Sequence, residues 1–334
     1  MKHRSIPAAA LTRPSQLEVT EMEVDEPGDG EVLIQVRAVG LCGSDAHWFV
    51  EGAIGDAHLG SGLVLGHEFC GVIASGSRTG ERVAVDPAIP CLVCEECVRH
   101  RHNLCLNLSF AGHGETHGAL REQLVWPERC LVPMPDDMPD EVGALLEPLG
   151  VAIHAVDLAE IDDTMTVGVI GSGPIGLLVV VALQARGITR VVATDPLSHR
   201  LGAAASLGAR AEPTPLADAS ARFDVVFDAA GTDAALASAL DLARPGGQVV
   251  VVGIPPGDRT TVTASMARRK ELTLRWCRRM NLGDLARAVS LATSRIDPLL
   301  GLVTHRYSLT DVGKAFETLV TRDGIKVLVN PGFG

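Results

Sequence analysis

One segment limits the possible folds of this chain more than any other: an apolar run that leads into three glycines. Residues 166–176 read Thr-Val-Gly-Val-Ile-Gly-Ser-Gly-Pro-Ile-Gly. The first glycine suits a tight turn, the second lets the backbone approach a pyrophosphate, and the third lets a helix pack closely on a strand. The helix that follows would offer its free amides to the phosphates. The segment predicts a dinucleotide site, with a plain turn as the alternative; the residues assigned to it are Gly171, Gly173, Pro174, Ile175 and Gly176.

An acidic residue at the end of the next predicted strand supports this interpretation. Asp195 lies 24 residues after Gly171, the distance at which an acid binds the adenosine ribose hydroxyls and repels a 2′-phosphate. We therefore expect NAD rather than NADP, although Arg200 follows nearby and would tolerate a phosphate. The alternative for Asp195 is a solvent-facing turn residue.

The pattern from about residue 151 onward is that of a doubly wound parallel sheet, because apolar runs alternate with helical stretches. We expect strands at 166–170, 190–194, 224–227, 248–252 and 271–275, and helices at 175–186, 199–207 and 233–243. Residues 245–247, Pro-Gly-Gly, would form the turn before the fourth strand. A helix at 282–292, a second helix at 311–321 and a strand at 325–329 would follow, and the tail from 301 need not belong to the nucleotide domain.

The first third of the chain has a different texture, rich in glycine and proline with short apolar alternations. A chain of 334 residues usually forms about two domains. We therefore predict an α/β protein that combines a β-rich domain with the doubly wound one. The boundaries we expect are 1–150 with 291–334 for the β-rich domain and 151–290 for the nucleotide-binding domain.

Charge and composition argue against several classes of partner. The formal net charge is −12, which repels nucleic acid and anionic membrane surfaces. No apolar run approaches the length of a membrane span. Residues 1–4 include basic residues, but proline, threonine, arginine and glutamate follow them instead of the sustained apolar core of a signal peptide. We therefore expect a cytoplasmic protein with no nucleic-acid or membrane partner.

Half of the eight cysteines are crowded into 15 residues. Thiolates two residues apart can share one tetrahedral ion, and the longer gap before the last one lets the chain return as the fourth ligand. Four sulfur ligands describe a structural zinc site; free thiols or an iron–sulfur centre are the alternatives. The four residues are Cys91, Cys94, Cys97 and Cys105.

A second candidate metal site lies upstream, in residues 42–47 (Cys-Gly-Ser-Asp-Ala-His) and 66–71 (Gly-His-Glu-Phe-Cys-Gly), with Glu147 just before the nucleotide domain. A cysteine, a histidine and a carboxylate form a donor set that suits zinc and leaves a position for water or substrate. Such an ion polarises a bound alcohol, so that hydride can leave from carbon.

In this order, the motifs resemble the zinc-dependent medium-chain alcohol dehydrogenase superfamily, over essentially the whole chain. Residues 42–56, Val-Leu-Gly-His-Glu at 64–68 and Leu-Glu-Pro-Leu at 146–149 are most similar to sorbitol and xylitol dehydrogenases. The resemblance implies a GroES-like catalytic domain and a Rossmann domain, with one catalytic and one structural zinc ion per chain. It also implies a homo-oligomer, a tetramer in preference to a dimer. Simple alcohol dehydrogenases usually have cysteine where this chain has Glu147.

The same resemblance assigns roles to residues by position. Cys42 and His67 would bind the catalytic zinc, Glu68 would be a direct or exchanging ligand, and Glu147 would bind zinc or its water. Ser44 would take the alcohol proton and His47 would pass it towards solvent by way of the cofactor ribose, whereas Asp45 would be structural. The residues that would lie on a substrate-lining loop or touch substrate hydroxyls are Trp48, Phe49, Glu51 and Arg279.

We therefore expect reversible, NAD-dependent oxidation of a secondary hydroxyl in a polyol, sugar alcohol or cyclitol to the ketone. Tyrosine is common in this branch at the positions of Trp48 and Met280, so the exact substrate stays open. The same chemistry on an amino-cyclitol, a threonine-like amino alcohol or a diol is one alternative. A non-catalytic protein that binds NAD and zinc is the alternative from another class.

Overall fold

The computed structural model describes residues 4–60, 62–214, 216, 222–257 and 259–332. Residues 1–3, part of the segment used to argue against a signal peptide, lie outside this description. The chain divides into two compact units, Met1–Glu147 with Leu285–Gly334, and Pro148–Asp284. Two helices, α4 (Leu146–Leu158) and α9 (Asp284–Thr293), cross the boundaries between them.

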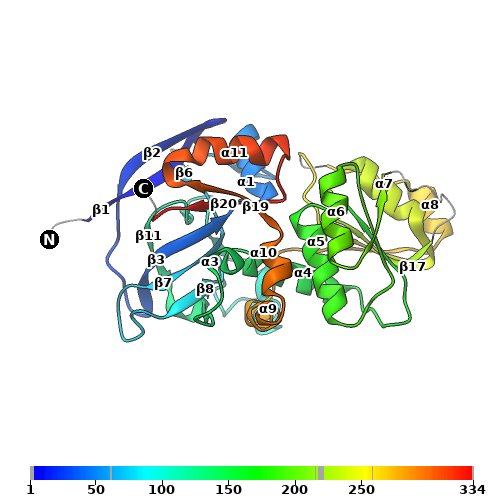
Figure 1. Cartoon of the computed structure of the whole chain (residues 1–334), viewed down its shortest axis with the longest axis horizontal. Helices are drawn as coiled ribbons and strands as arrows, with labels where there is room; N and C mark the ends of the chain where they lie inside the picture. Colours follow the sequence, from blue (N-terminus) through cyan, green and yellow to red (C-terminus); the bar gives the residue numbers. More distant parts are fainter. Residues whose placement is uncertain (1–3, 61, 215, 217–221, 258, 333–334) are drawn as a thin grey trace. The chain divides into compact units, whose positions relative to one another are not determined.

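The first unit is built mainly from strands (Figure 1). Its strands are β1 (Ser5–Arg13), β2 (Gln16–Glu23), β3 (Glu31–Gly40), β4 (Ala53–Ile54), β5 (Ala57–His58), β6 (Leu63–Val64), β7 (Glu68–Ile73), β8 (Arg82–Val85), β9 (Ala88–Ile89), β10 (Ser109–Phe110), β11 (Gln123–Pro127), β12 (Leu131–Pro133), β19 (Val303–Ser308) and β20 (Lys326–Asn330). Its helices are α1 (Gly43–Glu51), α2 (Glu95–Val98), α3 (Asp140–Gly143), α10 (Ile296–Leu300), α11 (Val312–Thr321) and the short 3₁₀ turns η1 (His102–Leu104), η2 (Glu128–Cys130) and η3 (Leu309–Asp311).

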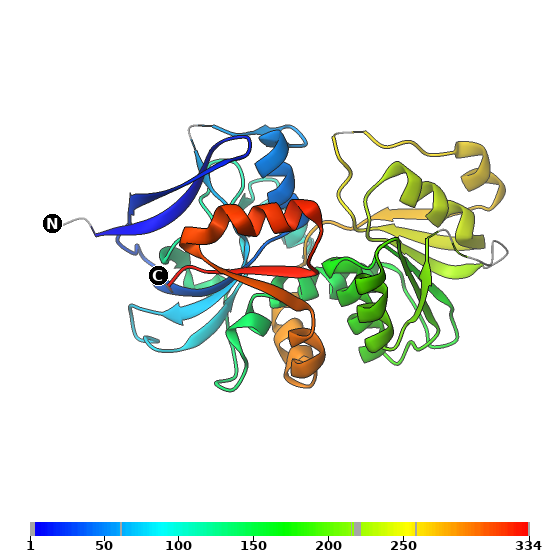
Figure 2. The same cartoon turned by 45° about the horizontal axis from the view of Figure 1, so that its top comes forward.

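A seven-stranded sheet forms the centre of this unit, in the order β12-β8-β7-β3-β20-β19 with β11 also paired to β3. The C-terminal strand β20 therefore lies directly beside β3, although almost the whole chain separates them in sequence. Helix α11 packs on β19 and β20, as Figure 2 shows. Buried side chains such as Ile34, Phe69 and Phe316 join the sheet and α11 in one hydrophobic core.

The second unit is a six-stranded parallel sheet in the order β15-β14-β13-β16-β17-β18. In chain order this is 3-2-1-4-5-6, the doubly wound arrangement of dinucleotide-binding domains. Its strands are β13 (Val167–Ile170), β14 (Val191–Asp195), β15 (Arg210–Pro213), β16 (Phe223–Asp228), β17 (Ala243–Val251) and β18 (Thr273–Trp276). Its helices are α5 (Pro174–Ala185), α6 (Ser198–Ser206), α7 (Asp233–Leu242) and α8 (Ala264–Arg269). The predicted doubly wound parallel sheet is confirmed.

The structure differs from the sequence-based elements at several places, among them short helices that were not predicted, such as α8 and α10. The predicted turn at 245–247 lies inside β17, where the register shifts between Phe223 and Val225 of β16. The prediction missed β15, a short edge strand of polar and small residues. It also missed α4, because Pro148 and Gly150 disguise the start of a helix; proline is tolerated in the first turn, where its missing N–H has no partner to lose.

Candidate active site

Three side chains of the first unit form a compact group of potential metal ligands. Cys42 precedes α1, His67 precedes β7, and Glu68 is the first residue of β7. One ligand atom from each lies within 4.8 Å of the others. A thiolate, an imidazole and a carboxylate are the donors that zinc accepts in catalytic sites with an open position. The residues present therefore fit the predicted ion.

Asp45 holds this group together from inside the core. One carboxylate oxygen, Oδ2, accepts a hydrogen bond of 2.9 Å from the Cys42 backbone N–H, which caps the start of α1. The other, Oδ1, accepts from Gly66 N at 3.4 Å and lies 3.5 Å from His67 Nδ1. A carboxylate on the distal ring nitrogen orients a ligating histidine. Asp45 is thus structural, as predicted, but its contact with His67 was not foreseen.

The loop before His67 depends on a glycine. Gly66 has a φ of +93°, which side-chain-bearing residues rarely adopt. A Cβ there would lie only 2.7 Å from Val39 Cγ1 and 3.2 Å from Leu120 Cγ. The chain can therefore turn tightly into β7 and present His67 and Glu68 side by side.

Two predicted proton-transfer residues lie on α1. Ser44 Oγ is 3.4 Å from His67 Nε2, the ring nitrogen opposite the one that faces Asp45. His47 lies one turn further along the helix, and its Nδ1 is 2.9 Å from Glu51 Oε1. The structure thus brings Ser44 to the group of potential ligands and pairs His47 with a carboxylate.

Burial and neighbouring charges shift the pKa values of His67 and Glu147. Burial lowers the pKa of His67, but the Asp45 carboxylate and the Cys42 thiol outweigh it, and the pKa ends well above its usual value. Glu147, at the start of α4, is buried, and this burial raises its pKa to about 8. The positive charges of His67 and Lys326 oppose that rise, whereas Glu68 adds to it. Glu147 lies outside the compact three-residue group.

Lys326 is a member of this cluster that the sequence analysis missed. It is 1% exposed on β20, and its ammonium contacts Glu68 Oε2 and donates to the Leu41 carbonyl at 3.1 Å. The sequence contained one indication of this pair, a lysine between the apolar residues Ile325 and Val327 in a predicted strand. Because lysine is almost never fully buried unless it is paired, that position predicts a buried acidic partner.

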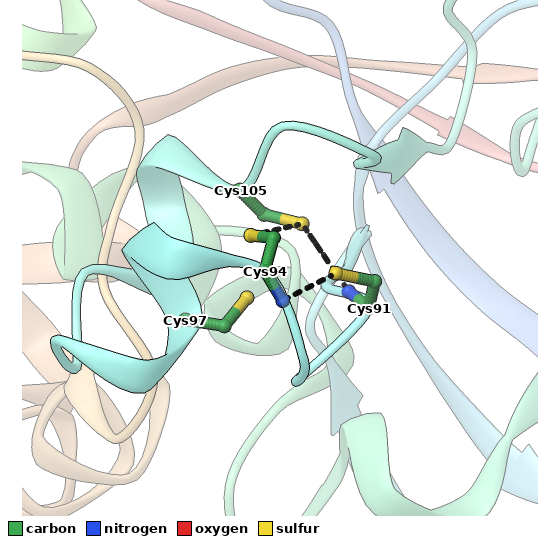
Figure 3. Close-up of side chains that lie close together, drawn as sticks. All are labelled: Cys91, Cys94, Cys97 and Cys105. Atoms are coloured by element: carbon green, nitrogen blue, oxygen red, sulfur yellow. Dashed lines mark hydrogen bonds between the residues drawn. The ribbon is translucent and has the colours of Figure 1, made fainter.

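The four clustered cysteines also come together (Figure 3). Cys91 and Cys94 come from the loop before α2, Cys97 from α2 and Cys105 from the end of η1. The Sγ atom of Cys105 lies 3.5 Å from that of Cys91 and 3.8 Å from that of Cys94. Four sulfurs at this spacing fit one tetrahedral ion with no open position.

The backbone of this loop prepares two of the thiols for a metal. Amide groups of Val93 and Cys94 lower the pKa of Cys91 to about 6, and amides of Leu106 and Cys97 lower that of Cys94. In contrast, burial and the neighbouring thiols raise the pKa of Cys97 to about 12. Thiolates are the form that binds metal.

The glycine loop of the second unit has the geometry that its sequence predicts. Gly171 has a φ of +91°, and a Cβ at Gly176 would collide with the Gly171 carbonyl oxygen. Gly173 caps α5, with Pro174 in the first turn and Ile175 beside it. The loop therefore approaches the start of the helix more closely than any residue with a side chain would permit.

Asp195 and Arg200 both lie near this loop. Asp195 Oδ2 accepts a 2.8 Å hydrogen bond from Ser172 N, and its Oδ1 accepts one of 2.9 Å from Leu197 N. Asp195 is buried rather than solvent-facing, so the alternative of an exposed turn residue is wrong. Arg200 Nη1 lies 3.5 Å from the position of a Cβ on Gly173.

The predicted substrate loop is a helix. Trp48, Phe49 and Glu51 all belong to α1, so their assignment to a loop is wrong. Trp48 is 2% exposed and meets the ring of His113 edge-on, and Phe49 packs on Phe316. The helix is capped locally, because the Asp45 carboxylate accepts from the Cys42 N–H three residues earlier, a signal that the sequence analysis did not use. Arg279 follows β18 in the other unit, with a φ of +56°.

Two family models match the two halves of the chain. An alcohol dehydrogenase GroES-like domain matches residues 28–136, and a zinc-binding dehydrogenase domain matches residues 174–294. D-xylulose reductase of Saccharomyces cerevisiae is 34% identical over 331 residues, which are 93% of this chain and 93% of that protein. This chain belongs to the zinc-dependent medium-chain alcohol dehydrogenase superfamily. It is an oxidoreductase of that superfamily, and the predicted likeness to the sorbitol and xylitol dehydrogenase branch is confirmed.

Solved structures agree over nearly the whole length of this dehydrogenase. L-idonate 5-dehydrogenase of Escherichia coli matches with a TM-score of 0.91 and 28% identity, and covers 99% of each chain. An alcohol dehydrogenase of Escherichia coli in complex with NADH matches with a TM-score of 0.88 and 28% identity, over 98% of this chain and 99% of the other. The GroES-like part of the predicted fold class is thereby confirmed too. Throughout the described ranges, every helix falls short of the length and apolarity that a bilayer crossing demands.

Proposed function

We propose that this dehydrogenase uses zinc and NAD to oxidise a secondary hydroxyl of a polyol, sugar alcohol or cyclitol reversibly to the ketone. The observation that carries the proposal is the convergence of Cys42, His67 and Glu68 within 4.8 Å in a chain of this superfamily. The D-xylulose and L-idonate specificities of two similar proteins favour a polyhydroxylated substrate.

The residues divide between two zinc ions and one nicotinamide cofactor. Cys42 and His67, with Glu68 or Glu147, would hold the catalytic ion, and the four clustered cysteines would hold the structural ion. When bound, the catalytic ion supplies Lewis acidity at the hydroxyl oxygen, and NAD accepts the hydride from carbon. In this proposal, residues 1–150 and 291–334 form the zinc-binding catalytic domain, and residues 151–290 form the NAD-binding domain.

The protein's own groups would handle the proton. Ser44, 3.4 Å from His67 Nε2, would accept the proton of the substrate hydroxyl, and His47 would pass it towards solvent by way of the cofactor ribose. Glu51 holds the Nδ1 side of His47, so that Nε2 is the nitrogen that accepts the proton. Phe49 and Arg279 are the proposed substrate contacts, and Trp48 shapes that wall from within the core.

The cofactor preference rests on Asp195, which we assign to the ribose hydroxyls of NAD. Its fixed position beside Ser172 would place a negative charge where NADP carries a 2′-phosphate. Arg200 Nη1 lies 3.5 Å from the position of a Cβ on Gly173 and could accept a phosphate, so NADP is the less preferred cofactor in this proposal. Assembly as a homo-oligomer, a tetramer first and a dimer second, and a cytoplasmic location complete the proposal.

The test is a screen of zinc-loaded protein for the near-ultraviolet absorbance of reduced nicotinamide. NAD and NADP are offered separately with polyols, sugars, cyclitols, amino alcohols, diols and simple alcohols, and zinc per chain is measured on the same sample. Turnover of polyols with NAD, lost on chelation, is expected. Turnover confined to another alcohol class would replace the substrate, and no turnover at full zinc occupancy and proven NAD binding would favour a binding protein.

A further inference from the structure

A fully buried lysine touches the candidate metal site without belonging to its donor set. Lys326, on β20, engages Glu68 Oε2 and donates to the Leu41 carbonyl. A buried charge costs free energy unless it is paired and hydrogen-bonded. Lys326 and Glu68, 1% and 2% exposed, satisfy that condition with each other. The pair joins two residues 258 positions apart in sequence.

Sheet register explains why these two side chains meet. Gly40 of β3 pairs with Glu68 of β7 on one side and with Leu328 of β20 on the other. Paired residues on neighbouring strands, and residues two apart on one strand, place their side chains on the same face of a sheet. Because Lys326 is two residues before Leu328, the side chains of Lys326 and Glu68 point to the same face. The ammonium therefore approaches Glu68 across the end of β3.

Gly40 supplies the space for the Glu68 oxygen that Lys326 engages. A Cβ on Gly40 would collide with Glu68 Oε2 and would lie 3.1 Å from the Ala144 carbonyl oxygen and 3.3 Å from Glu68 Cβ. One carboxylate oxygen is thus enclosed between a glycine and an ammonium group. The space at Gly40 is an observation independent of the Lys326–Glu68 ion pair, because it concerns shape rather than charge.

We propose that Lys326 and Gly40 fix Glu68 Oε2 and leave the other carboxylate oxygen of Glu68 to the catalytic metal. Lys326 is then a positioning residue of the metal site, which acts through Glu68 and touches neither metal nor substrate. This inference rests on the proposed zinc chemistry of Cys42, His67 and Glu68. It makes Glu68, rather than Glu147, the carboxylate ligand that the fold holds ready.

A double-mutant cycle on the full-length chain tests the inference. Lys326→Met, Glu68→Gln and the double variant are stripped of metal and titrated with Zn²⁺ against a chelator and with Co²⁺. The visible spectrum of Co²⁺ separates a site with one thiolate from a site with four. Loss of a group that orients a metal ligand commonly weakens metal binding about 10-fold or more. We expect about 10-fold weaker Zn²⁺ binding and an altered Co²⁺ spectrum for Lys326→Met, and no further change when Glu68 is already glutamine.

Three results would overturn the inference. Lys326→Met could leave Zn²⁺ affinity unchanged, it could raise Zn²⁺ affinity, or it could lower Zn²⁺ affinity by the same factor in the wild-type and Glu68→Gln proteins. If Lys326→Met does not fold, Gly40→Ala tests the same point from the other side. Its methyl group would displace Glu68 Oε2, so a folded Gly40→Ala protein with wild-type Zn²⁺ affinity and Co²⁺ spectrum would also contradict the inference.

The matched control is a lysine with a purely structural place. Lys270 Nζ donates to the Leu240, Asp241 and Ala243 carbonyls at the end of α7. Lys270→Met should lower the thermal stability and leave both metal sites unchanged. Cys42→Ser separates this inference from the proposed function. If Cys42→Ser keeps the metal of the catalytic site, the proposed function fails. If Cys42→Ser loses that metal and Lys326→Met keeps it, only the role of Lys326 is removed.

Discussion

The two candidate metal sites of this dehydrogenase are built in opposite ways. The cysteine cluster takes all its ligands from residues 91–105, in one loop with short helical turns. The mixed site draws on Cys42, His67, Glu68, Glu147 and Lys326, which come from four separate parts of the chain. The first needs only a loop that returns on itself, whereas the second exists only when β3, β7 and β20 are paired. We therefore expect the local site to serve stability and the assembled site to carry the chemistry.

The largest expected effect comes from the mixed site. Cys42→Ser removes a thiolate ligand, and we expect kcat/KM to fall about 1,000-fold or more, since the metal supplies several kcal/mol of stabilisation to the transition state. Steady-state kinetics with metal analysis provides the measurement. The comparison between the two sites fails if Cys42→Ser loses both metals, because the cysteine cluster should retain its own.

The complementary change is in the cysteine cluster. Cys105→Ser should lose one metal per chain and lower the free energy of unfolding by about 3 kcal/mol, because a structural metal contributes directly to folding. Denaturant titration and metal analysis measure the two quantities. The remaining metal should still support turnover; a Cys105→Ser protein with unchanged metal content would refute the zinc assignment.

The glycine loop and Asp195 allow a third test, because they were also predicted from a local sequence motif. Asp195→Ala should lower the ratio of NAD to NADP efficiency about 30-fold, because it removes a charged hydrogen-bond acceptor from the ribose. Kinetics with both cofactors gives the ratio, and Asp195→Asn is the control of equal shape. An unchanged ratio in Asp195→Ala would remove this residue from cofactor selection.

The smallest predicted effect concerns pH and the cluster without metal. Cys91 has a pKa lowered to about 6 by backbone amides, so it is a reactive thiolate above that pH and an unreactive thiol below it. Alkylation of Cys91 in metal-stripped protein should accelerate about 10-fold between about pH 5 and about pH 7. Cys277, whose pKa burial raises to about 12, should stay inert. Peptide mapping by mass spectrometry identifies each modified site, and a midpoint near the usual thiol pKa would contradict the prediction.

The contrast between local and assembled sites also explains what sequence could and could not predict. The glycine loop and five of the strands in the nucleotide-binding unit follow from motif and period, because each depends on neighbours in sequence. Cys42 and His67 were identified as candidate ligands from their donor chemistry, and their catalytic roles were assigned through resemblance to a family. The contact of Asp45 with His67 and that of Lys326 with Glu68 were missed, since each joins segments that are distant in sequence and meet only in the folded unit.

Helix α1 is a further error of the sequence analysis. Residues 43–51 contain Gly43 and two adjacent aromatic residues, and they show no strong helical stripe. The helix is capped locally by Asp45, and Trp48 is buried in the core. A local cap and a tertiary environment thus decide together a conformation that propensity alone leaves open.

The place of β20 has a consequence for how the enzyme acquires its metals during synthesis. Domains fold as the chain emerges from the ribosome, N-terminal parts first. The cysteine loop is complete once residue 105 has emerged and can capture an ion at that stage. Lys326 and its strand come more than 200 residues later, so the catalytic site can be finished only after the whole nucleotide-binding unit has been made. We therefore expect a nascent chain to be able to bind the proposed structural ion before its proposed catalytic site is complete.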